Sequence, residues 1–288
     1  MDQFRLSVII PIYRLNSGNT LEYFRKLIES ISLNIKNINS LSVFEIIIVN
    51  DSPEDYSETS VVNIFQEFQV GNLLKYYSNK SNRGQGYSRN FGAGQSSGDF
   101  LHFIDQDDYI FPDFYQNLKL GSQDLIMGDL WFNLNNKLLK KSYYKPWTKA
   151  LLRNASSFQS LSFLLMSNIA VSPGQYIIKK NLFERVGKFP DLKNKGSDDF
   201  GFLFNLSLHK DDVRFSFVSC AKFIYRIHDS QGSKSLILNN SVNEFFDNHT
   251  DERCFSFSHK AIRFIRQSNR LGLFGMLFYL LFFNRAKF

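Results

Sequence analysis

The chain has 288 residues, of which 43% are hydrophobic and 21% charged, and its formal net charge is +7. Enough apolar side chains are present for a packed core, which excludes a disordered chain. The first ten residues hold an acid and a base and are followed by Pro11, so no secretory signal is expected. Cys220 and Cys254 lack the spacing of a zinc site or a disulfide framework, which fits a reducing cytoplasm.

The first hundred residues alternate short β-rich runs with stretches of helical spacing. Strands are expected at 6–12, 44–49, 73–77 and 100–104, and helices at 20–34, 57–69 and 85–95. This alternation predicts an α/β fold with a mostly parallel mixed sheet, helices on both faces and a ligand at the carboxyl ends of the strands. Asp51 and Asp105 both fall at such ends.

The chain is less regular after Asp108. A short helix is expected at 112–120, strands at 125–127 and 130–133, a polar hairpin or loop at 135–149, a helix at 158–166, a strand at 176–178 and a helical turn at 181–186. No repeat or low-complexity linker interrupts this region. We therefore expect one domain over residues 1–238 and a helical C-terminal appendage over 239–288.

Four polar residues, Asp105-Gln-Asp-Asp108, directly follow the apolar run 100–104. Carboxylates beside a low-dielectric interior are costly unless a cation or hydrogen-bond donors meet them. An Asp-x-Asp pair at a strand end supplies hard oxygens suited to Mg²⁺ or Mn²⁺ shared with phosphates. For an isolated pair, a solvated acidic turn is the simpler interpretation, because turns favour Asp.

The flanking motifs change that interpretation. A glycine loop, Asn82-Arg-Gly-Gln-Gly-Tyr-Ser-Arg-Asn90, lies upstream of the acidic motif. A dinucleotide-binding Rossmann loop does not fit, because Arg89 stands where its third glycine belongs and the glycines follow the third strand instead of the first.

In order and approximate spacing, these motifs resemble the inverting family 2 glycosyltransferases of the GT-A fold. The matching features are the strand Ser7–Tyr13, the strand ending in Asp51, the loop ending in Arg89-Asn90, and Asp105-x-Asp107. The resemblance is strong over residues 5–115, weaker at 197–202 and 225–228, and absent beyond about 240. It implies a catalytic domain with a nucleotide-sugar half at about 1–110 and an acceptor half at about 111–238.

The resemblance implies a set of donor-binding residues along the strand ends. They are Pro11, Tyr13, Asp51, Arg83, Gly84, Arg89, Asp105 and Gln106. Asp51 is implied to bind the base of the nucleotide. Arg83 and Arg89 are expected to bind phosphate, since a planar guanidinium does so bidentately, although a surface helix charge remains the alternative for Arg83. The loop glycines let backbone approach the donor closely.

The resemblance also implies a divalent cofactor, Mn²⁺ or Mg²⁺, with Asp107, Asp105 and His228 as its ligands. Such an ion stabilises charge on the departing nucleoside diphosphate. His228 ends a strand-like run, and a structural role is its alternative.

Inverting transfer needs a base that takes the proton of the acceptor hydroxyl. Asp198-Asp199 resembles the acidic pair of the family, with Asp in place of the usual Glu at the first position. We expect Asp199 to be the base and Asp198 its support. The alternative is a pair of acids that complement a helix dipole.

Residues 255–288 carry six Lys or Arg residues and no Asp or Glu. The apolar run 271–283 is too short to span a membrane, which takes roughly 20 residues. We expect this tail to bind anionic lipid at the inner face of the cell membrane, which makes the protein cytoplasmic and peripheral. Packing on the catalytic domain or on a second copy in a homodimer is the alternative, and nucleic acid is not an expected partner.

The sequence therefore predicts a metal-dependent inverting glycosyltransferase. It would move a sugar from a nucleotide-sugar, a UDP-hexose, to a hydroxyl of a glycan or lipid-linked glycan in bacterial surface polysaccharide synthesis. A catalytically inactive glycan-binding module is one alternative, although the intact Asp51, Asp105, Asp107 and Asp199 argue against it. A nucleotidyltransferase is another, but it should carry a basic glycine-rich motif that residues 11–18 lack.

Overall fold

The computed structural model describes residues 4–37, 43–155, 170–191, 198–208 and 213–228. Within these ranges, nine strands form one sheet in the order β3-β2-β1-β4-β8-β6-β9-β5, and β7 pairs with β6 off this path. The strands are β1 Arg5–Ile12, β2 Val43–Asn50, β3 Leu74–Ser78, β4 Phe100–Phe103, β5 Tyr109–Ile110, β6 Leu125–Leu134, β7 Lys137–Ser142, β8 Tyr176–Lys179 and β9 Phe215–Ile227.

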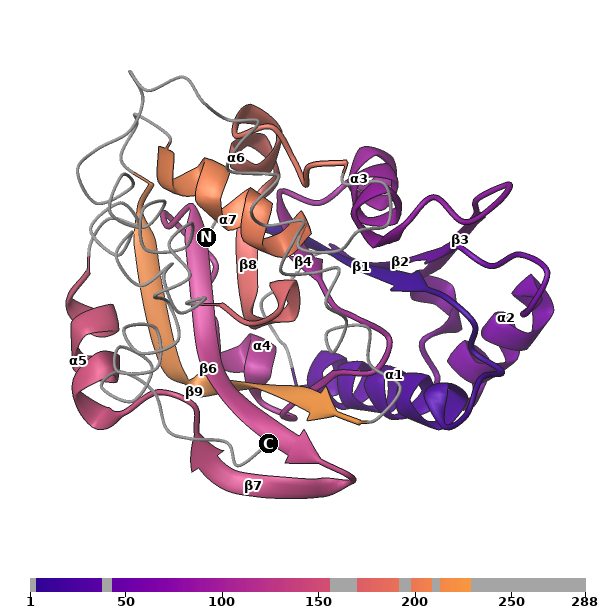
Figure 1. Cartoon of the computed structure of the whole chain (residues 1–288), viewed down its shortest axis with the longest axis horizontal. Helices are drawn as coiled ribbons and strands as arrows, with labels where there is room; N and C mark the ends of the chain where they lie inside the picture. The colour runs from indigo at the N-terminus through magenta and orange to yellow at the C-terminus, as the bar shows by residue number, and fades with distance from the viewer. Residues whose placement is uncertain (1–3, 38–42, 156–169, 192–197, 209–212, 229–288) are drawn as a thin grey trace, which may run out of the picture.

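Helices cover both faces of this sheet. They are α1 Thr20–Lys36, α2 Glu58–Glu67, α3 Gln85–Gln95, α4 Phe114–Asn117, α5 Pro146–Asn154, α6 Lys180–Arg185 and α7 Asp198–Leu208, with 3-10 turns η1 Gly71–Leu73 and η3 Pro173–Gln175. Figure 1 shows α1 and α2 on one side of the sheet and α3, α6 and α7 on the other. The predicted α/β architecture is confirmed.

The first four strands run parallel, as the alternating pattern predicts. Ile12 pairs with Asn50, and Asn50 pairs with Ser78, so β1, β2 and β3 end at the same edge. Helix α3 packs closely against this sheet at Gly92, which has no side chain. A Cβ at this position would lie 2.6 Å from Ile9 Cγ2. This close packing positions the residues of α3, including Arg89, above the strand ends.

The strands that follow residue 111 differ from the predicted pattern. The strands expected at 125–127 and 130–133 are one strand, β6, whose pairing with β9 shifts between Gly128 and Asp129. The carboxylate of buried Asp129 holds this irregularity, since it accepts hydrogen bonds from the Leu130 N–H, Trp131, Ser142 and Lys149. A bulge breaks the alternation of side chains, which explains why the sequence suggests two strands.

The segment predicted as a polar hairpin or loop at 135–149 forms a hairpin and a helix. Asn135 and Asn136 have φ of 47° and 63°, and they connect β6 to β7 as the left-handed pair of a two-residue turn. Helix α5 then begins at Pro146, a residue favoured in the first turn of a helix.

A buried carboxylate, Glu45, lies near the amino end of β2, away from the strand ends that carry Asp51. It accepts hydrogen bonds from Ser7 Oγ at 2.5 Å and Ser97 N at 2.6 Å, and it pairs with Lys75 Nζ at 2.5 Å. Burial opposes the charge, but these contacts outweigh it and lower the pKa of Glu45 to about 2. Glu45 therefore links β1, β2, β3 and the turn before β4 as a charged group.

Several expectations fall outside the described residues: the helix at 158–166, the loop residues before Asp198, Cys254, and the tail at 239–288. Cys220 is an exposed free thiol. Of the helices that the structure describes, none is long and apolar enough to cross a membrane.

Candidate active site

Asp51 lies directly after β2 and organises the loop that follows β3. Its buried carboxylate accepts hydrogen bonds from the backbone N–H groups of Arg83 and Gly84, each at 2.8 Å, and from Asn79 Nδ2 at 2.7 Å. Gly84 has φ of +89°, a conformation that side chains rarely adopt, and it is the N-cap of α3. Asp51 therefore fixes the glycine loop at the strand ends, where its predicted contact with a nucleotide base would be made.

A second clamp joins the ends of β1 and β4. Gln106 Oε1 accepts from the Tyr13 N–H at 2.7 Å, and Gln106 Nε2 donates to the Tyr13 carbonyl at 2.8 Å. Pro11 is buried within β1 opposite Val49. The two hydrogen bonds of Gln106 bring the predicted donor-binding residues Tyr13 and Gln106 into contact through the backbone of Tyr13.

Arg83 lies on the surface of the glycine loop that precedes α3. Its guanidinium lies 4.1 Å from the centroid of the Tyr87 ring, and the residue is exposed. A stacked but exposed guanidinium keeps its N–H groups accessible to a phosphate.

Arg89 has a different environment, because it is only 2% exposed. Its Nη2 contacts Asp105 Oδ1, and its Nη1 donates to Asp198 Oδ2 at 2.5 Å. Burial alone would lower the pKa of Arg89, but Asp105 and Asp198 outweigh it and keep the guanidinium charged. The predicted bidentate contact with phosphate would require these ion pairs to break. In this structure, Arg89 joins the end of β4 to the start of α7.

Asp107 and His228 meet at the other side of the acidic motif. Asp107 Oδ2 lies 2.9 Å from His228 Nε2, across 121 positions of sequence. The ring of His228 packs 5.1 Å from that of Tyr23. Two of the three predicted metal ligands are thus in direct contact.

Asp108 is fully buried behind this pair. It accepts from the Arg226 N–H at 2.9 Å and from Ser172 Oγ at 3.3 Å. Burial raises the pKa of Asp108 well above its usual range, and the nearby charges of Asp107 and Asp105 add to this effect. Its contacts attach the acidic motif to β9 and to the turn before η3.

Asp199 is the second residue of α7 and is partly exposed. Its Oδ1 accepts from the Phe200 N–H at 2.7 Å. Burial raises the pKa of Asp199 to about 7, the negative charge of Asp198 adds to this rise, and Arg89 opposes it. A carboxylate with a pKa near neutrality can take and release a proton at physiological pH.

Comparisons with known proteins show which family the chain resembles. Residues 7–120 match the family described as Glycosyl transferase family 2. Glycosyltransferase GlyA of Streptococcus pneumoniae is 27% identical over 244 residues, which are 80% of this chain and 32% of GlyA. Poly(ribitol-phosphate) beta-N-acetylglucosaminyltransferase TarP of Staphylococcus aureus is 25% identical over 279 residues, which are 94% of this chain and 77% of TarP. Residues 7–120 belong to glycosyltransferase family 2.

The fold agrees with this family. The crystal structure of S. aureus TarS 1-349 in complex with UDP-GlcNAc superposes with a TM-score of 0.61 at 19% identity, covering 84% of this chain and 65% of that one. This likeness shows the GT-A fold. The chain spans about a third of the length of GlyA and about three quarters of TarP.

Family 2 glycosyltransferases generally use a divalent metal. Among the described residues, no group of three or more His, Cys, Asp or Glu side chains lies close enough to hold a cation. The pair Asp107 and His228 nevertheless offers oxygen and nitrogen ligands at one point. Within the described ranges, the hydrogen bonds to the Asp105 carboxylate use Oδ1 and leave Oδ2 for a ligand. One or two protein ligands fit a Mg²⁺ or Mn²⁺ ion whose remaining ligands are diphosphate oxygens and water.

The sequence interpretation missed three residues that hold this candidate site together. Asn79 holds Asp51, Gln85 Nε2 donates to Asp105 Oδ1 at 2.9 Å, and Arg226 Nε donates to the Asp107 carbonyl at 2.8 Å. Asn79 follows β3 as Asp51 follows β2, a positional signal that could have identified it. Arg226 and Asp107 are separated by 119 positions in the sequence, so no local sequence pattern predicts their contact.

Proposed function

We propose that this family 2 member is a metal-dependent inverting glycosyltransferase that moves a sugar from a UDP-hexose to a hydroxyl of a glycan or lipid-linked glycan. The observation that carries the proposal is the buried bridge from Asp105 through Arg89 to Asp198. It connects Asp105, which follows β4, to the first turn of α7, which carries Asp199. A donor site and a base of pKa about 7 thereby belong to one connected unit.

Proton transfer is assigned to Asp199. Its Oδ1 is engaged by the Phe200 N–H, so Oδ2 takes the proton of the acceptor hydroxyl. The acceptor oxygen forms a bond to the anomeric carbon as the bond from that carbon to the phosphate oxygen breaks. The electron pair leaves with the nucleoside diphosphate, and the attack from the opposite face inverts the anomeric configuration.

Asp51 and the glycine loop bind the nucleotide in this proposal, and exposed Arg83 contacts phosphate. Asp107 and His228, with Asp105, would hold the divalent ion. The ion, when bound, stabilises the negative charge of the leaving diphosphate. UDP is favoured as the nucleotide because TarS, which shares the fold, has been crystallised with UDP-GlcNAc.

The acceptor is assigned to cell-surface polysaccharide synthesis, since TarP carries poly(ribitol-phosphate) in its name and is similar over 94% of this chain. The basic and apolar tail would bring the enzyme to anionic membranes at the cytoplasmic side. Removal of residues 271–288 should then abolish sedimentation with anionic vesicles at low salt while UDP binding persists. Equal sedimentation of both proteins would refute the membrane role.

Calorimetry of UDP binding tests the donor and metal assignments. UDP should bind in Mn²⁺ and lose most of its affinity in chelator or in Asp107→Ala, because the carboxylates and diphosphate then repel one another. Asp113→Ala is the matched control, since Asp113 is an exposed acid shortly after the motif. Unchanged UDP affinity in Asp107→Ala would show that the metal site is assigned wrongly.

A further inference from the structure

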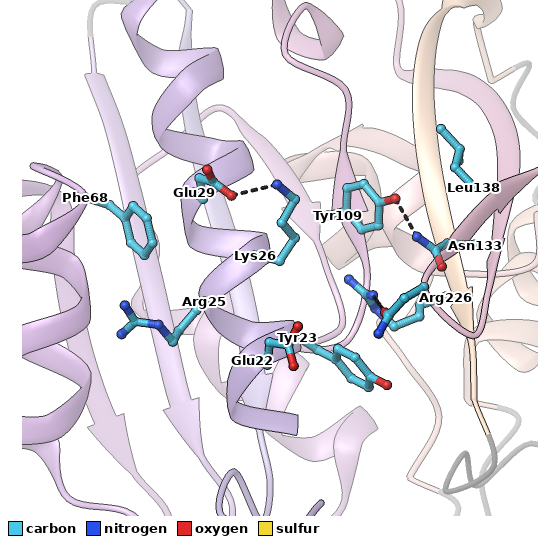
Figure 2. A pocket seen from close by; sticks show the side chains of 11 residues that line it. Glu22, Tyr23, Arg25, Lys26, Glu29, Phe68, Tyr109, Asn133, Leu138 and Arg226 are labelled. Carbon is cyan, nitrogen blue, oxygen red and sulfur yellow. Dashed lines mark hydrogen bonds and ion pairs between the residues drawn. The ribbon is translucent and has the colours of Figure 1, made fainter. Parts of the chain in front are cut away.

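A pocket of about 510 Å³ lies between α1 and the β6–β7 hairpin. None of the residues assigned above to the donor, the metal or proton transfer lines it. Figure 2 shows Tyr23, Lys26 and Glu29 on the α1 side, and Asn133 and Leu138 on the hairpin side. Its volume is within the range of sites for small molecules, about 300–1,000 Å³.

Arg226 connects the lining of this pocket to the acidic motif. The guanidinium of Arg226 lies 4.2 Å from the Tyr23 ring centroid and 5.1 Å from that of Tyr109. Its Nη1 donates to Asn136 Oδ1 at 2.7 Å, and its Nε donates to the Asp107 carbonyl. A ligand that contacts Arg226 in this pocket would therefore lie close to Asp107.

The cations of the pocket already have acceptors. Lys26 pairs with Glu29 at 2.7 Å, and Arg25 pairs with Glu67. Arg226 is held by the Asp107 carbonyl and by Asn136. An anionic ligand would have to compete for each of these groups, so the pocket is poorly suited to a phosphate.

One buried acceptor of the pocket lacks a hydrogen-bond donor within the described residues, and a second acceptor is exposed at its rim. Asn133 is 6% exposed, and its Oδ1 has no hydrogen-bond partner within the described part of the chain. Glu22 contributes an exposed carboxylate at the rim. Buried polar atoms are normally satisfied, and ligand hydroxyl groups would supply donors here. Paired charges with spare acceptors favour an uncharged polyhydroxyl compound.

We propose that this pocket binds an uncharged sugar unit of the acceptor glycan, beyond the sugar whose hydroxyl reacts. The proposal rests on the proposed function, because it gives that reaction its acceptor subsite. Tyr23 lines the pocket and also packs against the ring of His228, so the pocket adjoins a residue of the candidate active site.

Saturation-transfer NMR on the full chain tests this subsite with maltotriose, cellotriose and diacetylchitobiose as neutral ligands and inorganic phosphate as the anion. Saturating UDP and Mn²⁺ keep nucleotide in the donor site. Leu138→Trp should fill the pocket, and Lys141→Trp is the control, because Lys141 is exposed on the same strand and does not line the pocket. Circular dichroism verifies that both variants fold, and Glu22→Gln provides a second surface change within the pocket.

We expect at least one neutral sugar to bind the wild type and Lys141→Trp, with its Kd raised about tenfold or more in Leu138→Trp and raised also in Glu22→Gln. UDP affinity should be equal in all four proteins. The proposal is overturned if no sugar binds the wild type, if sugar binding ignores Leu138→Trp, or if phosphate alone responds to that change. Sugar binding that depends on Leu138 in a protein that never binds UDP would refute the proposed function and the acceptor role, but not the sugar site.

Discussion

Arg89 Nη1 and Asp198 Oδ2 lie 2.5 Å apart in the protein interior, although 109 positions separate the two residues. The same guanidinium contacts Asp105 through Nη2. The Arg89 guanidinium thus neutralises two carboxylates, one that follows β4 and one in the first turn of α7, the helix that carries Asp199. Arg89 therefore joins β4 to α7, and the proposed donor binding and proton transfer should both depend on this side chain.

Replacement of Arg89 tests this connection. Arg89→Ala leaves Asp105 and Asp198 without their counter-charge, which should lower the free energy of unfolding by about 3–5 kcal/mol. Arg89→Lys keeps the charge but cannot reach both carboxylates bidentately, so the fold should survive while transfer falls. Denaturant unfolding and donor turnover measure these effects. Arg25→Lys is the control, because its exposed pair with Glu67 should cost less than about 1 kcal/mol.

Gly86 controls how closely α7 approaches α3. A Cβ at this position would lie 3.1 Å from both Cβ and Oδ2 of Asp198. Gly86→Ala should therefore displace Asp198 from Arg89, destabilise the fold by about 1–3 kcal/mol and reduce transfer. Gly94→Ala in the same helix meets nothing within 4 Å and should stabilise by about 0.5–1 kcal/mol. Equal melting temperatures for the two variants would contradict this packing argument.

The raised pKa of Asp199 gives the reaction a pH dependence. A base must be ionised, so kcat/KM should increase as pH rises through about 7 and level off above it. Asp199→Asn should remove this dependence and reduce turnover by ~10²–10⁴ without weakening UDP binding. Asp198→Asn should be milder, since an amide oxygen still accepts from Arg89. A profile that falls between pH 6 and 8 in the wild type would exclude Asp199 as the base.

Much of the structure of residues 5–110 could be predicted from the sequence because its signals are local. Helix α3 has the predicted bounds, and Asp51 and Asp105 lie at strand ends as expected. The direction of the Arg89 side chain could not be predicted, because its partner Asp198 lies far along the chain. The bulge at Asp129 was also hidden, since it depends on side chains from β7 and α5.

Glu45 should make stability depend on acid pH. Its folded pKa of about 2 lies below the ordinary value of 4.5, so its stabilisation is present above about pH 4.5 and is lost as pH falls toward 2. Glu45→Gln removes the ion pair with Lys75 and should cost about 1–3 kcal/mol at neutral pH. Urea unfolding at pH 7 and pH 3 checks this expectation. The two proteins should differ less at pH 3, and a constant difference would contradict the assignment.

The stereochemistry of donor hydrolysis tests the central claim most directly, because water can replace an unknown acceptor. Proton NMR follows an α-linked UDP-hexose or UDP-N-acetylhexosamine with Mn²⁺ and records which anomer of the free sugar appears first. An inverting enzyme with Asp199 as its base should release the β anomer first, and Asp199→Asn should abolish the release. Initial appearance of the α anomer, release that survives Asp199→Asn, or no release from any donor would contradict the account.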